Sequence, residues 1–206
     1  MSADRGHWAF YQTKDLAMVP YMQGTPVYKD GMLPFLYTKT REEGKIETVF
    51  CGDDLNMDSF VDFFVKRKTM QVLCEIEDDK TLRPVGYSWL DNPVGVDVAR
   101  GALCGFCFFN GASKRESARD LGRLGLGYWF LAMKIDVVHG ILLESNIPAR
   151  NYALRLGFKE VGIVPKRHFH NGALEGARVM MIERKDFEPS FDEWYEEQKG
   201  VAELVG

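Results

Sequence analysis

Residues 139–158 read HGILLESNIPARNYALRLGF. The apolar run 139–144 has strand character, and Asn146 and Pro148 stand in the polar turn that follows it. Gly157 comes just beyond a segment that carries several alanines and arginines, and Phe158 opens a new extended stretch. Proline in the first turn and glycine just past the last one is the order that helix termini prefer. The segment therefore predicts a strand, a tight turn, a short helix and a second strand.

A glycine-rich segment precedes this unit, because residues 122–133 read GRLGLGYWFLAM. Glycines before a helix let the main-chain N–H groups of its first turn approach a phosphate, and the helix dipole favours the negative charge. Helical periodicity over 124–138, with Leu124, Tyr128, Leu131 and Ile135 on one stripe, places the start of that helix near Leu124. The alternative is a turn that needs glycines for its geometry alone.

Two motifs in this order resemble signatures of the GNAT superfamily of acyl-CoA N-acyltransferases. Asn146, Ala149 and the pair Gly157 and Phe158 are similar to the family's N-x-x-A…G-F motif. The run Gly122-Arg123-Leu124-Gly125-Leu126-Gly127 is similar to its pyrophosphate loop, Q/R-x-x-G-x-G/A. The last two glycines match, whereas the first stands where the family has Arg or Gln. The resemblance extends over residues 70–187.

The resemblance implies an α/β (α+β) fold with a mixed, mostly antiparallel central sheet flanked by helices. We expect residues 1–206 to form a single GNAT-like domain with a variable N-terminal part (1–69), a core (70–187) and a C-terminal helix (188–206). Local patterns predict a helix over 53–68, strands over 70–77, 85–90 and 98–109, and a polar loop over 110–120. Two later strands, 159–169 and 177–185, flank the Asn-Gly turn in HNGALEG.

The two ends of the chain are read from weaker signals. Pro20, Pro26 and Pro34 argue against helices in residues 1–50, so 33–39 is taken as the first strand by elimination. Near the other end, Ser190 and Glu193 form a capping box that predicts a helix starting at Pro189. We expect that helix to pack on its own domain.

The bulk composition restricts the classes of function. The chain has 206 residues, of which 46% are hydrophobic and 13% aromatic, enough for a packed core. A net charge of −4 gives no general attraction to nucleic acid. The first residues lack the apolar run of a signal peptide, and no apolar stretch is long enough to span a bilayer. We therefore expect a cytoplasmic protein that binds neither membrane nor nucleic acid.

The cysteines do not predict a metal site. Cys51, Cys74, Cys104 and Cys107 lack a second Cys or His pair at the spacing that a zinc site requires. A chain of this length also does not need a disulfide framework. We expect four thiols in the core and no metal.

The cofactor that the resemblance implies is acyl-CoA, and acetyl-CoA is the expected donor. Its pyrophosphate would bind the main-chain amides of Gly122, Arg123, Leu124, Gly125, Leu126 and Gly127. Arg115 and Arg119, like Arg123, are candidates for added charge. In the family the strands that correspond to 103–109 and 139–144 part and pair with the pantetheine arm. This places Phe108, Phe109, Asn146 and Ala149 beside the cofactor, with Asn146 either bonding the arm or only bracing the turn.

The reaction that the resemblance implies is direct attack of a primary amine on the thioester in a ternary complex. A main-chain N–H near Phe106 to Phe108 would stabilise the oxyanion. The family's tyrosine acid, seven residues after the asparagine, corresponds to Ala153, so Tyr152 is the neighbouring candidate, as a general acid or as a core residue. Glu144 is the candidate base, with Glu75 as an alternative.

Two further questions stay open at this stage. His168 and His170 share one face of a predicted strand, either as proton shuttles or as ordinary core or surface histidines. The acceptor is expected to be a small molecule or peptide with an amino group, and a homodimer is not excluded by the sequence. The alternative function is a GNAT-fold module that binds acyl-CoA or a partner without turnover.

Overall fold

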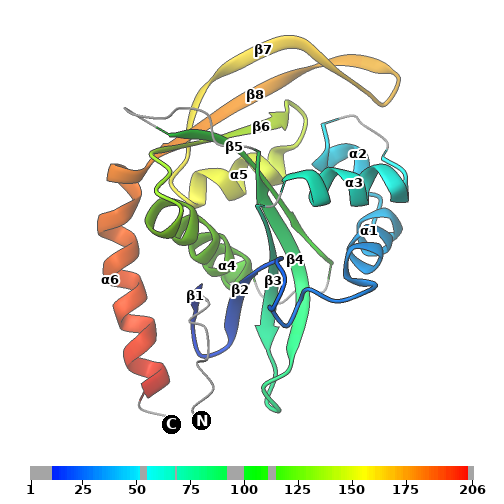
Figure 1. Ribbon diagram of the computed structural model, residues 1–206. Coiled ribbons are helices and arrows are strands. Elements are labelled where there is room, and N and C mark those ends of the chain that lie inside the picture. Colours follow the sequence, from blue (N-terminus) through cyan, green and yellow to red (C-terminus); the bar gives the residue numbers. More distant parts are fainter. Residues whose placement is uncertain (1–10, 52–54, 68, 92–99, 111–114, 204–206) are drawn as a thin grey trace.

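A computed structural model describes residues 11–51, 55–67, 69–91, 100–110 and 115–203 (Figure 1). Within these residues eight strands form one sheet in the order β1-β2-β3-β4-β5-β6-β8-β7. Their bounds are β1 Tyr11–Gln12, β2 Leu16–Pro20, β3 Met70–Ile76, β4 Leu82–Leu90, β5 Gly101–Phe108, β6 Val137–Leu143, β7 Lys159–His170 and β8 Ala173–Glu183. The predicted element ends at 53–54, 68, 98–99 and 111–114 lie outside the described residues.

All neighbouring strands pair antiparallel except β5 and β6, which are parallel. Parallel neighbours require a crossover, and the chain between β5 and β6 supplies it as α4 (Arg115–Gly127) and the π-helical turn η1 (Tyr128–Ala132). This mixed, mostly antiparallel sheet is the fold class that the sequence predicts. The crossover is also the step that sets two strand ends side by side at the site described below.

Helices cover both faces of the sheet (Figure 1). On one face lie α1 (Met32–Glu42), α2 (Ile46–Val49) and α3 (Met57–Arg67). They pack on the sheet through a cluster of aromatic side chains that includes Phe60, Phe64, Tyr87 and Trp89. The other face is covered by α4, η1, α5 (Ile147–Arg155) and α6 (Arg184–Glu203).

The segment that decides the fold has the predicted local structure. The side-chain oxygen of Asn146 accepts the N–H of Ala149 (3.1 Å) and caps α5, Pro148 lies in the first turn, and Gly157 follows with φ 96°. Such a left-handed residue after a helix favours glycine, which lacks a Cβ. The Asn-Gly turn is confirmed as well, since Asn171 and Gly172 join β7 to β8 with φ 50° and 79°.

Two predictions at the ends of the chain are wrong. Residues 33–39 lie in helix α1 and not in a strand, because Pro34 falls in the first helical turn, where its missing N–H has no intrahelical acceptor to lose. Helix α6 starts at Arg184, directly after β8, and continues through Pro189. The hydroxyl of Ser190 donates to the carbonyl of Phe187 (3.0 Å) instead of capping a new helix.

Candidate active site

The strands β5 and β6 are hydrogen-bonded to each other over only part of their length. Their parallel ladder runs from Gly101 opposite Val137 to Cys104 opposite Gly140 and ends there. Beyond it β5 stays paired with β4 as far as Phe108, and β6 stays paired with β8 as far as Leu143. Each strand therefore keeps its outer partner while the inner edges separate.

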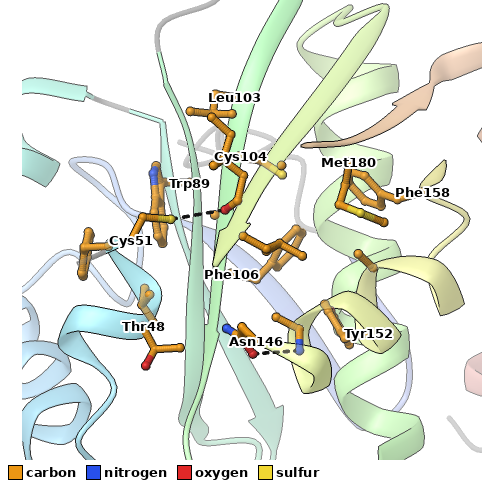
Figure 2. Close-up of a pocket in the computed structure, with 18 of the residues that line it drawn as sticks. Thr48, Cys51, Trp89, Leu103, Cys104, Phe106, Asn146, Tyr152, Phe158 and Met180 are labelled. Carbon is orange, nitrogen blue, oxygen red and sulfur yellow. Dashed lines mark hydrogen bonds between the residues drawn. The ribbon is translucent and has the colours of Figure 1, made fainter. Parts of the chain in front are cut away.

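The inner edge of β5 presents main-chain groups to this opening. Asp91 N–H donates to Leu103 O (2.7 Å) and Phe109 N–H donates to Val85 O (2.9 Å), both towards β4. Because main-chain groups alternate from side to side along a strand, the N–H and C=O of Phe106 and Phe108 point the other way. On β6, the carbonyl of Ile141 faces the opening, where it accepts the Cys51 thiol (3.4 Å; Figure 2).

A cavity of about 340 Å³ lies between the parted strands. Its walls come from the C-terminal end of α2, α3, the end of β4, β5, β6, α5, β7 and β8. Figure 2 shows side chains from α2, β4, β5, α5 and β8 around it. The apolar wall is largely aromatic: Phe50, Phe63, Trp89, Phe106, Tyr152 and Phe158. The charged or protonatable side chains in the described lining are Cys51, Asp91, Cys104, Tyr152, Arg167 and His168.

The indole of Trp89 fixes the vertex of the opening, which is the point where β5 and β6 begin to separate. It lies flat across Gly105 of β5, so that a Cβ added at Gly105 would lie 2.1 Å from Trp89 Cζ2. The indole also stacks on Phe50, with ring centroids 5.4 Å apart. Only glycine at this strand position lets the ring lie against the main chain. The floor of the cavity is therefore set by the contact between β4 and β5.

Helix α5 contributes Asn146, Ala149 and Tyr152 to the lining. The Tyr152 hydroxyl donates to the carbonyl of Ala118 in α4 (3.0 Å), and its ring packs edge-on against Phe106 and Phe108. Burial raises the pKa of Tyr152 well above its ordinary value, and the nearby Cys104 adds to the effect. Tyr152 therefore joins α5 to α4, with its hydroxyl proton directed at Ala118 O, and its role as a general acid stays a prediction.

The prediction of a glycine loop at 122–127 is wrong. All six residues lie in the second half of α4, where main-chain N–H groups are used by the helix itself. A Cβ at Gly122 would lie 2.1 Å from the Tyr152 hydroxyl, and one at Gly127 would lie 2.4 Å from the ring of Phe191. Leu124 and Leu126 are fully buried, and the Arg123 guanidinium lies over the Trp194 ring, 5.2 Å from its centroid. These glycines serve close packing within a helix, so the alternative of a turn that needs glycines is wrong as well.

Three other predicted residues, Phe108, Phe109 and Glu144, are not in the cavity lining. Phe109 is buried on the opposite face of the sheet, against Phe35 and Tyr87. Phe108 lies at the end of β5, where its carbonyl accepts the Lys45 ammonium (2.7 Å). Glu144 is outside the lining: its N–H donates to Gly176 O (2.9 Å), and its carboxylate lies over Gly176 in β8. The geometry thus removes Glu144 from the candidate bases within the cavity.

Sequence reasoning missed several lining residues. Cys51 and Asp91 come from connections that follow α2 and β4, and no motif marks either one. The four cysteines, predicted as core thiols, divide into two pairs: Cys74 and Cys107 are buried, whereas Cys51 and Cys104 line the cavity. His168 was noted only as one of two histidines on a strand face. Sequence alone does not show which side of a bulged strand faces the site.

Neither a metal cluster nor a membrane span is found in the part of the chain that the structure describes. No three His, Cys, Asp or Glu side chains there are grouped to hold a metal ion. No helix there is long and apolar enough to cross a membrane.

The architecture is similar to that of several solved structures. A GNAT-family acetyltransferase from Bacillus anthracis superposes with a TM-score of 0.65 at 16% identity, over 85% of this chain and 99% of that one. Spermidine N-acetyltransferase from Vibrio cholerae, in complex with CoA and spermine, gives 0.65 at 17% identity, over 84% and 97%. RimJ from Mycobacterium smegmatis, in complex with CoA-disulfide, gives 0.64 at 14% identity, over 85% and 87%. The sequence itself matches no family model and no curated protein.

The parted strands, the crossover through α4 and the long β7–β8 hairpin together define the fold class. The chain has the fold of the GNAT acyl-CoA N-acyltransferases. The resemblance seen in the asparagine motif is thereby extended to the whole sheet and its helices.

Proposed function

We infer that the protein transfers an acyl group, with acetyl as the expected one, from coenzyme A to a primary amine. The observation that carries this inference is the opening between β5 and β6, whose inner edges border a cavity. A pantetheine arm carries two amides and has the width of a strand, so it fits an edge with unpaired main-chain groups. The cavity beyond Cys104 and Gly140 would then hold the thioester and the acceptor amine.

The N-terminus of α4 is the better candidate for the pyrophosphate. It begins at Arg115, close after the end of β5, and its first-turn amides have no acceptor within the helix. The Lys45 ammonium lies at the same end of β5, where it donates to Phe108 O (2.7 Å) and Asn110 Oδ1 (2.8 Å). Lys45, whose ammonium is also paired with the Glu43 carboxylate (2.7 Å), therefore fixes this strand end.

The acceptor would enter from the side formed by α2, α3 and β7. The described lining there has one carboxylate, Asp91, and one guanidinium, Arg167. Asp91 gives an ammonium group a counter-charge, and the aromatic wall gives its carbon skeleton an apolar surface. One carboxylate suits an acceptor with a single ammonium group, such as a monoamine or a peptide N-terminus, better than a polyamine.

Catalysis in such a site depends first on orientation. Holding two reactants in line supplies about 7–11 kcal/mol of the barrier, whereas a general acid contributes about 10²–10⁴-fold. The coenzyme supplies the activated carbonyl and a thiolate leaving group. The chain supplies the two edges that orient the arm, and the Phe106 N–H that faces the opening is the candidate oxyanion donor.

A second candidate function is binding of acyl-CoA without turnover. The observation in its favour is Tyr152, whose hydroxyl is bonded to Ala118 O instead of facing the cavity. A site without a tyrosine acid would still bind the coenzyme, but it would lose part of its catalytic activity.

Thermal unfolding and thiol release separate these functions. Acetyl-CoA at millimolar concentration is expected to raise the melting temperature, and a thiol reagent is expected to detect free coenzyme A once an amine is added. A panel of tyramine, spermidine and an alanine-initiated tripeptide covers the acceptor classes. Stabilisation with no thiol released by any amine would favour the binding module. No stabilisation at all would contradict both functions.

A further inference from the structure

A bulge in the β7–β8 hairpin turns His168 towards the cavity. Val164 pairs with Ala177 and His168 with Glu175, so that three residues of β7 lie opposite the single Gly176. Lys166, within the bulge, has φ 50°. A non-glycine residue in this region costs on the order of 1–3 kcal/mol and persists where the surroundings enforce it. Bulges redirect side chains next to active sites, and here Arg167 and His168 are the residues of β7 that line the cavity.

His168 has one buried nitrogen with no partner. Within the described residues its Nε2 is shielded from solvent and makes no hydrogen bond. Buried polar atoms in proteins are bonded in the large majority of cases. Since His168 lines the cavity, a turn of its ring would bring this nitrogen to a polar atom of whatever binds there. This distinguishes His168 from a histidine that merely fills the core.

The neighbours of His168 hold the hairpin in place. His170 Nδ1 lies 3.0 Å from Glu175 Oε2, and the other oxygen of Glu175 accepts the main-chain N–H of Ser145. Ser145 directly precedes Asn146, the cap of α5. The inner face of the hairpin is thus tied to the turn that borders the cavity. His168 is positioned by contacts in which it takes no part itself.

The other protonatable groups around the cavity leave few proton acceptors. Tyr152, on α5, donates to Ala118 O, and burial raises its pKa. Cys104, on β5, also has a raised pKa because it is buried and lies near Asp91. Arg167, on β7, carries no lone pair to share. Cys51 donates to Ile141 O. The described lining therefore offers two acceptors, the Asp91 carboxylate and the His168 imidazole.

We propose that His168 is the general base of the acyl transfer, which makes this inference dependent on the proposed function. The acceptor ammonium gives one proton to Nε2, and the neutral amine forms a C–N bond with the thioester carbonyl carbon. The C–S bond breaks, the coenzyme thiolate leaves with its electron pair, and it takes up the second proton of the nitrogen. The imidazolium then returns its proton to water. The products are one amide, one thiol and one proton.

Histidine suits this task better than the carboxylate. As a residue type it exchanges protons near neutral pH, where a general base is most effective. Asp91 lies at the end of β4, where its main-chain N–H is bonded to Leu103 O (2.7 Å). In this arrangement Asp91 attracts the ammonium group and His168 takes its proton.

The test compares His168→Gln with His170→Gln, a matched change two residues further along the same strand face. Glutamine keeps the polar character but takes up no proton. We expect His168→Gln to lower kcat by about 10²–10⁴-fold, with acetyl-CoA still raising the melting temperature as in the wild type. The acid limb of the kcat/KM profile against pH is expected to disappear. His170→Gln should keep that limb, because His170 is outside the cavity.

A second variant distinguishes a catalytic role of His168 from misfolding. Turnover by the wild type distinguishes failure of this role from failure of the proposed function. In His168→Ala, added imidazole is expected to restore part of the lost rate, which a structural role would not allow. Wild-type turnover together with an unchanged rate and pH profile in His168→Gln would overturn the role of His168 alone. Absence of thiol release by the wild type with every amine in the panel would instead overturn the transfer reaction.

Discussion

The opening between β5 and β6 and the second half of α4 show opposite kinds of packing. In α4 two glycines, Gly122 and Gly127, allow Tyr152 and Phe191 to approach the helix main chain, and no space for a Cβ remains at either one. Between the strands, main-chain edges lie apart and border a cavity of about 340 Å³. The glycine-rich segment resembled a ligand loop, whereas the strand edges carry no motif. Glycine marks close approach of protein to protein in both regions, by Tyr152 and Phe191 in the helix and by Trp89 at Gly105 beside the opening.

After His168→Gln, the largest effect is expected at Gly105, where the Trp89 ring packs against β5 beside the opening. Gly105→Ala places a Cβ 2.1 Å from the Trp89 ring and forces the indole to move into the cavity. Since a misplacement of about 1 Å costs about 100-fold in rate, kcat/KM for acyl transfer should fall by about that factor. Gly101→Ala is the control on the same strand, because nothing lies within 4 Å of its Cβ position. Equal activity of the two variants would contradict this account of the vertex.

Within α4, two glycines should respond in opposite directions. Gly122→Ala meets the Tyr152 hydroxyl and should lower the free energy of unfolding by about 1–3 kcal/mol through overpacking. Gly125→Ala meets its nearest atom, Gln71 Oε1, at 3.4 Å, and should stabilise the helix by about 0.5–1 kcal/mol. Urea unfolding measures both. Adding Tyr152→Phe to Gly122→Ala should recover part of the loss. Weaker acetyl-CoA binding by Gly125→Ala would revive the loop interpretation.

The stability of the protein should depend on pH because of two thiols, Cys74 and Cys107, on the sheet face that α1, α2 and α3 cover. Burial raises the pKa of Cys74 to about 12 and that of Cys107 to about 11. As the pH rises above the ordinary thiol value, about 8.5, the unfolded chain loses these protons before the folded one does. The stabilisation is therefore complete below that value and is lost as the pH rises towards 11. The expected slope is about 1.4 kcal/mol per pH unit for each thiol.

Urea unfolding at pH 8 and pH 10 checks this slope in the wild type and in Cys74→Ala and Cys107→Ala. Each variant removes one thiol, so each should show a shallower loss of stability between the two pH values. An identical loss in all three proteins would mean that the two thiols are not shielded on this face. Such a result would weaken the contrast with the open cavity.

A small effect is expected at Asn146, which lines the cavity. Asn146→Ala removes the cap of α5 and should cost about 1 kcal/mol. Asn146→Ser keeps an oxygen for the Ala149 N–H and should restore that stability. We expect the serine variant to bind acetyl-CoA as tightly as the wild type, because the observed bond of Asn146 is the cap. Reduced affinity with restored stability would show that the amide also bonds the pantetheine arm.

The local elements were largely predictable, and the exceptions have a common cause. The unit around Asn146 and Gly157 and the Asn-Gly hairpin follow from dihedral preferences and capping, which depend on neighbours in the chain. Helix α1 was missed because Pro34 was read as a helix breaker, and α4 was placed too late, near Leu124, because its glycines were read as a phosphate loop. Proline is tolerated in the first turn, and packing against α5 and α6 offsets the cost of glycine within a helix.

By itself the sequence determined most of the order of strands and helices beyond residue 55, the asparagine-capped helix and the resemblance to GNAT acyltransferases. Only the tertiary structure decided where the site lies. The cavity arises because β5 and β6 each keep an outer partner and lose the inner one. Its polar groups, Asp91 and His168, are 77 positions apart in the sequence and share no pattern. Both line the cavity because the bulged β7–β8 hairpin and the end of β4 reach the same opening. Positions so far apart in the sequence are brought together only when the chain folds.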